Sequence, residues 1–303
     1  MRTLRGIAIG VAALLVIIAI SFVVLLAPKD RASQAKESIV ISAGESRSDI
    51  ARELNDKKLI KSQFAFALYS RLIGGNILPG TYEFSATQSA SSIAEQLASG
   101  RFLTTKITII EGWRALDMEA YLVEEKKLTQ LKGFAEAAEP YDGYLFPDTY
   151  EVKIDLTIDD LITLMRENFV SRTKDLKINP EIVIMASIVE REAKADSERA
   201  AIAGVYTNRM KIGMRLQADP TIQYAKGNWK AVTVDEYRSV ISPYNTYLND
   251  GLPPGPICSP GLKSLQASIS PETHDYLYFF HAKGQTYFSK TLAEHEAKVR
   301  QYF

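Results

Sequence analysis

The sequence of 303 residues contains little cysteine and little histidine, which excludes several kinds of site. Its single cysteine, Cys258, cannot form an intramolecular disulfide, a cysteine-based zinc site or a CxxC redox pair. The three histidines form no HExxH motif, so a zincin-type metalloprotease is excluded. The sequence also lacks a GxSxG nucleophile elbow and a phosphate-binding P-loop. We therefore expect no metal site and no organic cofactor.

An excess of charge of one sign is also missing, because 36 basic and 36 acidic residues cancel. Residues 1–36 carry five basic groups and one acidic group, which leaves residues 37–303 with a net charge of −4. A protein that binds nucleic acid usually presents a basic surface that neutralises phosphates. We therefore expect no nucleic acid among the partners. Hydrophobic residues at 46% and charged residues at 24% are typical of a globular protein.

A long apolar run occupies residues 7–27, where only Gly10 and Ser21 interrupt the hydrophobic side chains. A helix of this length, at about 1.5 Å per residue, spans the roughly 30 Å hydrocarbon core of a bilayer. Signal peptides have shorter apolar cores, of about 7–15 residues. We therefore predict a cytoplasmic N-terminus at 1–6, a transmembrane helix at 7–27 and a polar linker at 28–37. The alternative is an unusually long signal peptide, and the flanking basic residues do not decide the orientation.

A weak internal repeat follows the linker, and each copy has the pattern of a short strand, a turn and a helix. The copies begin near Ile39, Tyr82 and Ile107, at irregular spacing, so they do not form a solenoid. The pattern predicts small units in which a helix packs on a sheet.

The remaining sequence predicts mainly helices, with strands near its end. Apolar residues at helical spacing indicate helices at 159–176 and 197–213. Between them, Asn179 and Pro180 form a helix start signal, and the helix that follows is apolar on almost every face, so we expect it to be buried. Five prolines within 243–260 predict a rigid loop, and residues 276–288 predict a hairpin. Together these elements predict an α+β fold.

Glu190 is the most informative candidate for catalysis, because it directly follows the apolar run Ile182–Val189. Burial disfavours a charged carboxyl, and a protonated glutamate can act as the general acid that cleaves a glycosidic bond. The residues alone leave a second interpretation open and favour it. In that interpretation, Glu190 forms an ion pair with a nearby arginine or lysine at the end of the helix.

Glu192 lies two residues further along the same helix, a rotation of about 200°, so the two carboxyls face opposite ways. They cannot form the facing pair of a standard glycoside hydrolase. We expect Glu192 to be a solvated charge that pairs with Lys194 or Arg199. We also expect Glu198 and Arg199 to lie on the surface.

Two polar, aromatic loops follow these helices, at 215–224 and 242–247. Aromatic faces together with amides and carboxylates suit a sugar-binding pocket, although both segments also have the composition of simple turns. We expect both loops to form one groove with Glu190. The candidates for contact with a substrate are Gln217, Asp219, Tyr224, Asn245 and Tyr247.

Four long motifs resemble the YceG-like family, and the resemblance covers about residues 38–303. They occur in the family's order and read GYLFPDTYEV (143–152), ASIVEREA (186–193), VYTNRMKIGMRLQADPTIQYAKG (205–227) and SPYNTYLNDGLPPGPICSPG (242–261). The last hairpin departs from the family, since Lys283–Thr286 stand where relatives often have a Gly-Gly-His turn. That departure puts a role for the hairpin tip in doubt.

The resemblance implies a single-pass protein of the cytoplasmic membrane, with a LysM-like subdomain at 38–104 and a catalytic domain at 105–303 outside the membrane. It implies an endolytic lytic transglycosylase that cleaves the β-1,4 bond between N-acetylmuramic acid and N-acetylglucosamine in nascent peptidoglycan strands. The expected role is in wall remodelling and in ending glycan elongation, beside the wall-synthesis machinery and its penicillin-binding proteins. The family's catalytic glutamate maps to Glu190.

Two rival functions remain open at this stage. The first is a peptidoglycan-binding scaffold in which Glu190 is structural. The second is a true glycoside hydrolase, in which a second carboxylate such as Asp219 faces Glu190. The products distinguish all three, because only a lytic transglycosylase leaves a 1,6-anhydro end.

Overall fold

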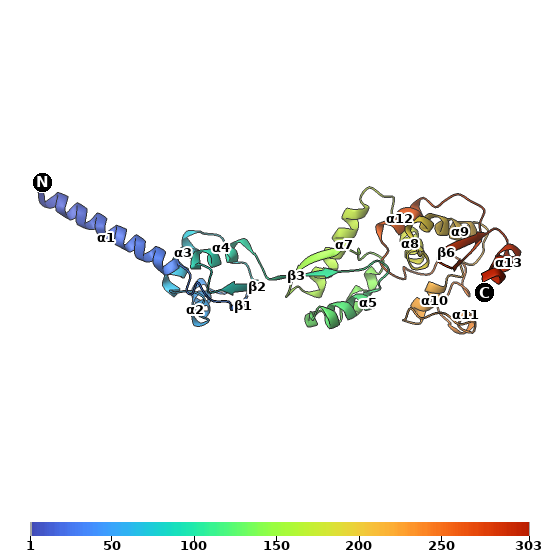
Figure 1. The fold of residues 1–303 in the computed structure, drawn as a ribbon, viewed down its shortest axis with the longest axis horizontal. Coiled ribbons are helices and arrows are strands. Elements are labelled where there is room, and N and C mark those ends of the chain that lie inside the picture. The colour runs from blue at the N-terminus through green and yellow to red at the C-terminus, as the bar shows by residue number, and fades with distance from the viewer. Residues whose placement is uncertain (1, 303) are drawn as a thin grey trace. The chain divides into compact units, whose positions relative to one another are not determined.

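The computed structural model describes residues 2–302, with side chains from residue 5 onward (Figure 1). Helices alternate with three two-stranded sheets, which confirms the predicted α+β class. The chain divides into two compact units. One unit contains the residues up to Thr105 together with Glu151–Asp155, and the other contains Lys106–Tyr150 together with the residues from Leu156 onward.

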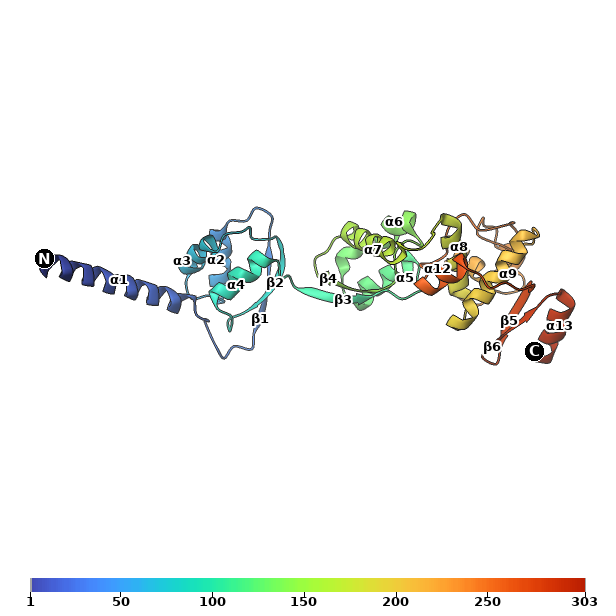
Figure 2. The ribbon, with the colours of Figure 1, turned by 90° about the horizontal axis from the view of Figure 1, so that it is seen from above.

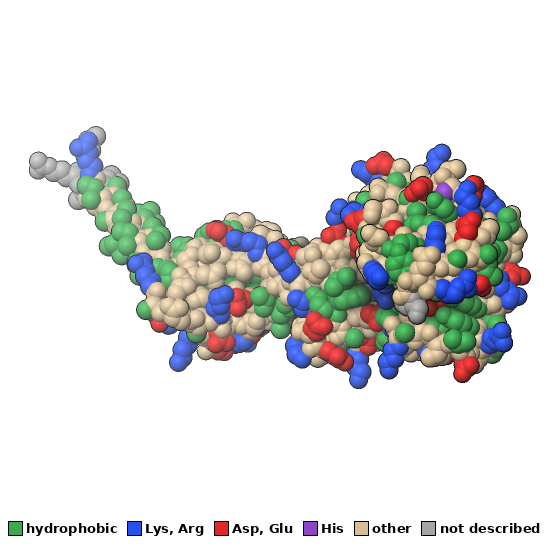
Figure 3. Space-filling view, turned by 45° about the vertical axis from the view of Figure 1, so that its right-hand side comes forward, with side chains coloured by type: hydrophobic (Ala, Val, Ile, Leu, Met, Phe, Trp, Pro, Cys, Tyr) green, Lys and Arg blue, Asp and Glu red, His purple; other side chains and the backbone are tan. Residues whose placement is uncertain are grey.

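The first element is helix α1 (Arg2–Leu26), which contains the predicted apolar run. Its segment Arg5–Leu26 has a mean hydropathy of 3.2 and is 6% buried, and it is the one span among residues 2–302 that is long and apolar enough to cross a membrane. Figure 3 shows hydrophobic side chains over the surface of this helix. The helix is consistent with a single-pass anchor. Its last turn differs from the rest, because Phe22 and Leu26 pack against the core of the first unit.

The rest of the first unit is a two-stranded sheet covered by three helices. Strands β1 (Lys36–Ile41) and β2 (Gly80–Ser85) pair antiparallel, with Lys36 opposite Ser85. The strand therefore includes the last two residues of the predicted linker. Helices α2 (Arg47–Asp56), α3 (Gln63–Leu72) and α4 (Ala90–Ser99) each begin at a serine whose side chain accepts a backbone N–H, which is a preferred N-cap.

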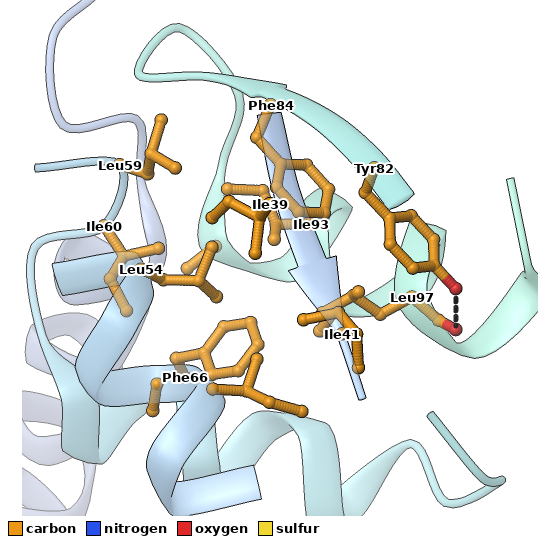
Figure 4. Packing of buried hydrophobic residues seen from close by; sticks show 14 of the residues in the cluster. Ile39, Ile41, Leu54, Leu59, Ile60, Phe66, Tyr82, Phe84, Ile93 and Leu97 are labelled. Atoms are coloured by element: carbon orange, nitrogen blue, oxygen red, sulfur yellow. Dashed lines mark hydrogen bonds between the residues drawn. The ribbon is translucent and has the colours of Figure 1, made fainter. Parts of the chain in front are cut away.

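Alternating side chains of the two strands meet the helices in a closed core (Figure 4). Ile39 and Ile41 come from β1, and Tyr82 and Phe84 from β2. The Tyr82 hydroxyl is satisfied inside this core, because it donates to the Leu78 carbonyl at 2.7 Å. Phe66 of α3 completes the core with its side chain fully buried.

The second sheet pairs β3 (Thr104–Thr108) with β4 (Thr149–Lys153). The third predicted copy of the repeat therefore pairs with a distant strand and does not extend the first sheet. The segment between these strands contains α5 (Ala115–Ala120), a π-helical turn (Tyr121–Glu125) and α6 (Phe134–Ala138). Short 3₁₀ turns lie at Thr129–Leu131 and Glu139–Tyr141.

The centre of the second unit is helix α8 (Pro180–Glu192), with α7 (Ile158–Thr173) preceding it. The predicted start of α8 is confirmed, since Asn179 Oδ1 accepts the N–H of Ile182 at 2.8 Å and Pro180 occupies the first turn. Six of its residues are buried, as the apolar pattern predicted. Helices α9 (Arg199–Lys211) and α12 (Leu262–Ile269) pack against it.

Two short helices, α10 (Asp219–Ala225) and α11 (Glu236–Ser239), precede the proline-rich segment. In the described chain no helix or strand lies between Ser239 and Leu262, which agrees with the predicted loop. The predicted hairpin is confirmed as β5 (Tyr278–Ala282) and β6 (Gln285–Ser289), and α13 (Leu292–Tyr302) lies alongside it (Figure 2). Lys283 and Gly284 both have positive φ, as a two-residue hairpin turn requires.

Replacing Phe66 by alanine should lower the free energy of unfolding of the first unit by about 3–5 kcal/mol, because the change opens a cavity in its core. Phe64 on the same helix is the matched control, since its side chain is 73% exposed. Its alanine variant should stay within about 0.5 kcal/mol of the wild type. Urea unfolding followed by hydrogen exchange in residues 36–99 measures both. Equal effects would contradict the packing described here.

Candidate active site

Helix α8 carries both candidate carboxyls at its C-terminal end and sends them into different surroundings. Glu190 points toward α12 and the first residue of α9, whereas Glu192 meets the middle of α9. The predicted opposite orientation of the two side chains is therefore confirmed. The two carboxyls differ in their chemistry because they have different hydrogen-bond and ion-pair partners.

Glu190 is held in a buried ion pair. Its side chain is 6% exposed, and its Oε1 lies 2.9 Å from Arg199 Nη1. Its Oε2 accepts the N–H of Gly261 at 2.9 Å and the hydroxyl of Ser264 at 2.8 Å. Both oxygens therefore accept hydrogen bonds. The ion pair with Arg199 is the interpretation of Glu190 that the sequence favoured. Arg199 is buried beside it, so its predicted surface position was wrong: packing against α12 covers this first-turn residue.

A glycine makes one of these contacts possible. A Cβ built on Gly261 would lie 2.0 Å from Glu111 Oε1, so a side chain there would push that carboxyl away. Without a side chain, the backbone of residue 261 can approach and donate its N–H to Glu190. The close approach explains why glycine stands at this position.

Glu192 is a different kind of carboxyl. The Tyr206 hydroxyl donates to its Oε1 at 2.8 Å. The pKa of Glu192 is raised to about 7, mainly by burial and also by the charge of Asp219, against the lowering effects of Tyr206, Lys194 and Arg209. The prediction of a solvated Glu192 was wrong. The rotation along α8 turns this side chain against α9 and not into solvent.

Asp219, at the start of α10, is the second carboxyl of this group. Its Oδ1 accepts the hydroxyl of Tyr247 at 2.6 Å. Burial raises the pKa of Asp219, while hydrogen bonds from Tyr247 and Tyr237 lower it. The two tyrosine rings stack, with centroids 4.2 Å apart and planes 17° apart. We call Glu192, Tyr206, Asp219, Tyr237 and Tyr247 the acid cluster.

The two predicted substrate loops come together beside this cluster. The N–H of Gln217 donates to the Thr246 carbonyl at 3.1 Å, and that of Ala218 donates to the Thr246 hydroxyl at 3.0 Å. The side chain of Gln217 is exposed, so its side-chain amide can meet a ligand. The backbone of this residue has a φ of 49°. The loops therefore adjoin Glu192 through Asp219 and Tyr247.

Two of the predicted contact residues lie elsewhere. Asn245 is fully buried, and its amide donates to the carbonyls of Tyr237 and Val240, so it supports the loop and does not reach solvent. Tyr224 donates its hydroxyl to Asp142 at 3.2 Å and lines a separate cavity. For Asn245, the alternative interpretation is therefore the correct one: the residue shapes a turn and does not contact a substrate.

The sequence patterns missed three residues around Glu192. Tyr206 belongs to the apolar stripe of α9 and gave no sign that its hydroxyl meets a carboxyl. Arg209 is buried and donates to the carbonyls of Leu277 and Leu216. Tyr237 precedes the second loop by five positions, and its stacking on Tyr247 depends on the fold.

The terminal hairpin reaches the segment that follows Glu192. His281 and Thr286 face each other across the strands, with His281 Nδ1 2.8 Å from the Thr286 hydroxyl. That hydroxyl also contacts Glu198, which accepts the backbone N–H groups of Lys194 and Ala195. Glu198 is partly exposed, so its predicted place near the surface holds, and its carboxylate also fixes the turn between α8 and α9. Among the described side chains, no cluster of His, Cys, Asp and Glu has the grouping of a metal site.

A buried carboxyl beside two polar loops is an arrangement found in proteins that cleave bonds by proton transfer. The family model described as the YceG-like family matches residues 39–301, so the chain belongs to that family. The endolytic murein transglycosylase of Bacillus subtilis is 32% identical over 92% of this chain and 88% of its own length. The enzyme of that name from Streptococcus pneumoniae D39 is 27% identical over 91% of this chain, which spans 60% of the pneumococcal protein.

A solved structure supports the same assignment. The crystal structure of a yceG-like protein from Listeria monocytogenes matches 88% of this chain and all of its own chain, with 33% identity and a TM-score of 0.55. The similarity covers both units described above.

Replacing Arg199 by alanine should lower the free energy of unfolding by about 3–5 kcal/mol, because Glu190 would remain buried without its cation. The matched control is Arg215→Ala, since Arg215 pairs with Asp250 at a surface where the two side chains are 46% and 77% exposed. That variant should lose no more than about 1 kcal/mol. Urea titration of both variants measures the difference. Similar losses in both would mean that the Glu190 pair is not a buried one.

Proposed function

We propose that this chain cleaves murein glycan strands as an endolytic transglycosylase, with Glu192 as its acid and base. The observation that carries the proposal is the buried Glu192 carboxyl, whose burial raises its pKa to about 7. Such a group is partly protonated at neutral pH, as a general acid must be. The names of the curated relatives supply the reaction and the substrate.

One carboxyl is sufficient for this reaction. Protonated Glu192 donates its proton to the oxygen that links N-acetylmuramic acid C1 to the next sugar, and that bond breaks. The resulting carboxylate then removes the proton from the C6 hydroxyl of the same muramic acid as its oxygen attacks C1. The product has a 1,6-anhydro end, and no water is consumed. The attacking hydroxyl belongs to the reacting sugar, so the step gains the advantage of an intramolecular reaction.

The resemblance assigned this role to Glu190, and that assignment stays a prediction. The contacts of the two carboxyls favour Glu192. Glu190 accepts three hydrogen bonds, one of them from a buried arginine, and a proton donor in that position would first have to break its ion pair. The Glu192 carboxyl accepts the Tyr206 hydroxyl, and the residue as a whole is half-buried at the end of α8.

Residues of the two loops would hold the sugar. Asp219 and Tyr247 lie beside the acid, and Gln217 is exposed next to them, so we retain these three as substrate contacts. Asp219 also has an electrostatic role, since its charge raises the pKa of Glu192. A negative group in this position can stabilise the positive charge that develops on the sugar ring.

The first unit would bind the same polymer. Its sheet and helices form a cavity of about 570 Å³, lined by the turn after β1 and the segment before β2. We infer that this unit is the LysM-like subdomain expected at 38–104 and that the cavity holds the glycan. The anchor would then keep the catalytic domain outside the cytoplasmic membrane, next to nascent strands and the penicillin-binding proteins that make them.

A hydrolase is the second candidate, because Asp219 is close enough to influence Glu192 electrostatically. Two acting carboxyls would activate water and leave a reducing end. Mass analysis of the products decides between the two reactions, since the anhydro product is lighter by one water. A scaffold that only binds murein would give neither product.

Glu192→Gln should reduce glycan cleavage by at least about 10²–10⁴-fold, because an amide keeps the shape of the side chain but cannot transfer a proton. Glu190→Gln is the matched control on the same helix and should lose stability more than turnover. Chromatography of the muropeptides released from purified strands measures both variants. An active Glu192→Gln together with an inactive, folded Glu190→Gln would return the catalytic role to Glu190.

The pH dependence of kcat/KM should show a limb near pH 7, with activity falling as pH rises, because the acid must be protonated. Tyr206→Phe removes a hydrogen bond that lowers the pKa of Glu192, so the limb should move to higher pH. Asp219→Asn removes a charge that raises this pKa, so the limb should move to lower pH. Shifts in the same direction would contradict the assigned contacts.

A further inference from the structure

A cavity of about 460 Å³ lies in the second unit at the N-terminal end of α8, opposite the end that carries Glu192. Pro180 and Ile184 of α8 form one side of it. Asp142, Tyr144, Tyr224 and Tyr244 face it from other segments of the unit. None of these residues belongs to the acid cluster, although Tyr224 was predicted to contact sugar.

The charged residues that line this cavity all have one sign. They are Asp142 and Glu139, and the described lining residues include no lysine, arginine or histidine. Burial raises the pKa of Asp142 to about 6, although the Tyr224 hydroxyl and the Ala115 N–H donate to its carboxyl. The cation that acts on it, Arg114, is engaged by Asp117 at 2.9 Å. Burial destabilises the charged form of this carboxyl, and a cationic ligand in the cavity would stabilise that form.

Aromatic rings complete the lining. The Tyr224 and Tyr244 rings have centroids 4.6 Å apart and planes tilted by 44°. A Cβ built on Gly255 would lie 3.0 Å from the Tyr244 hydroxyl, so the proline-rich loop closes tightly on this ring. Aromatic faces beside carboxylates attract an ammonium group, since the ring quadrupole and the anion act in the same direction.

We propose that this cavity binds a primary ammonium group carried by a peptide stem of the murein strand. The proposal rests on the proposed function, because murein strands bear peptide stems and uncross-linked stems keep the free amine of a diamino residue. Asp142 and Glu139 accept its hydrogen bonds, and the tyrosines cover its methylene chain. The site would thereby direct cleavage toward strands whose stems are not yet cross-linked.

The distances within the unit fit one substrate. Ile184 precedes Glu192 by eight residues of one helix, which corresponds to about 12 Å along the axis. Tyr224 and Asp219 belong to the same short helix, α10, five residues or about 7 Å apart. An extended stem of three or four residues spans about 10–14 Å. One strand can therefore place a glycosidic bond at Glu192 and a stem amine in the cavity.

The test compares two substrates with the full-length protein: uncross-linked strands with free stem amines and the same strands after N-acetylation. Acetylation removes the charge and leaves the glycan unchanged. The wild type should cleave the free-amine strands with about tenfold higher kcat/KM, mainly through KM, as expected for one charged hydrogen bond. Asp142→Asn should lose this preference and cleave acetylated strands like the wild type.

Two further variants keep the test decisive. Glu181→Gln removes an exposed acid of the same helix end that lies outside the cavity, so it should retain the full preference. Glu139→Gln changes an exposed cavity residue and should weaken the preference even where Asp142→Asn fails to fold. Equal cleavage of both substrates by the wild type would overturn the inference and leave the proposed function standing.

Cleavage of neither substrate would contradict the proposed function, and binding then tests the cavity separately. Calorimetry with the free stem peptide, which contains no glycosidic bond, should show binding to the wild type and a loss of about tenfold in affinity after acetylation. Equal affinity for the two peptides, or none for either, would overturn the inference.

Discussion

The burial of α8 is the constraint on which the second unit depends. A helix that is apolar on almost every face must be covered by neighbours, and α7, α9, α12 and the proline-rich loop supply that cover. Its last turn carries two glutamates that the neighbours must accommodate. One is neutralised by Arg199 and the other is left with a tyrosine hydroxyl, so the packing of one helix produces two carboxyls of unlike chemistry.

Much of the fold could be predicted from local patterns, because caps, periodicity and turn residues act within a few positions. The start of α8 at Asn179 and the two-residue turn at Lys283 are of this kind. The site was harder to predict from the sequence, because it depends on contacts between residues far apart in the sequence. Helical rotation correctly separated Glu190 from Glu192, but no local signal shows that α12 covers Arg199 or that Tyr206 faces Glu192.

The contrast between local signals and long-range contacts also explains which of the predicted sugar contacts lie beside Glu192. Asp219 and Tyr247 were chosen by residue type and do lie together, because the Thr246 backbone joins their loops. Asn245 has equally suitable chemistry, yet its amide is consumed by the carbonyls that shape its own loop. Residue type identifies what a side chain can bind, and the backbone around it decides whether the side chain is free to do so.

The last turn of α1 gives the first unit a firm attachment. Phe22 and Leu26 belong to the core of that unit, and Lys61 donates to the Val24 carbonyl at 3.4 Å. A flexible linker at the end of α1 would allow the first unit to rotate freely relative to the helix. Because the last turn of α1 packs into the core of the first unit, the direction of the helix and the orientation of the unit are coupled.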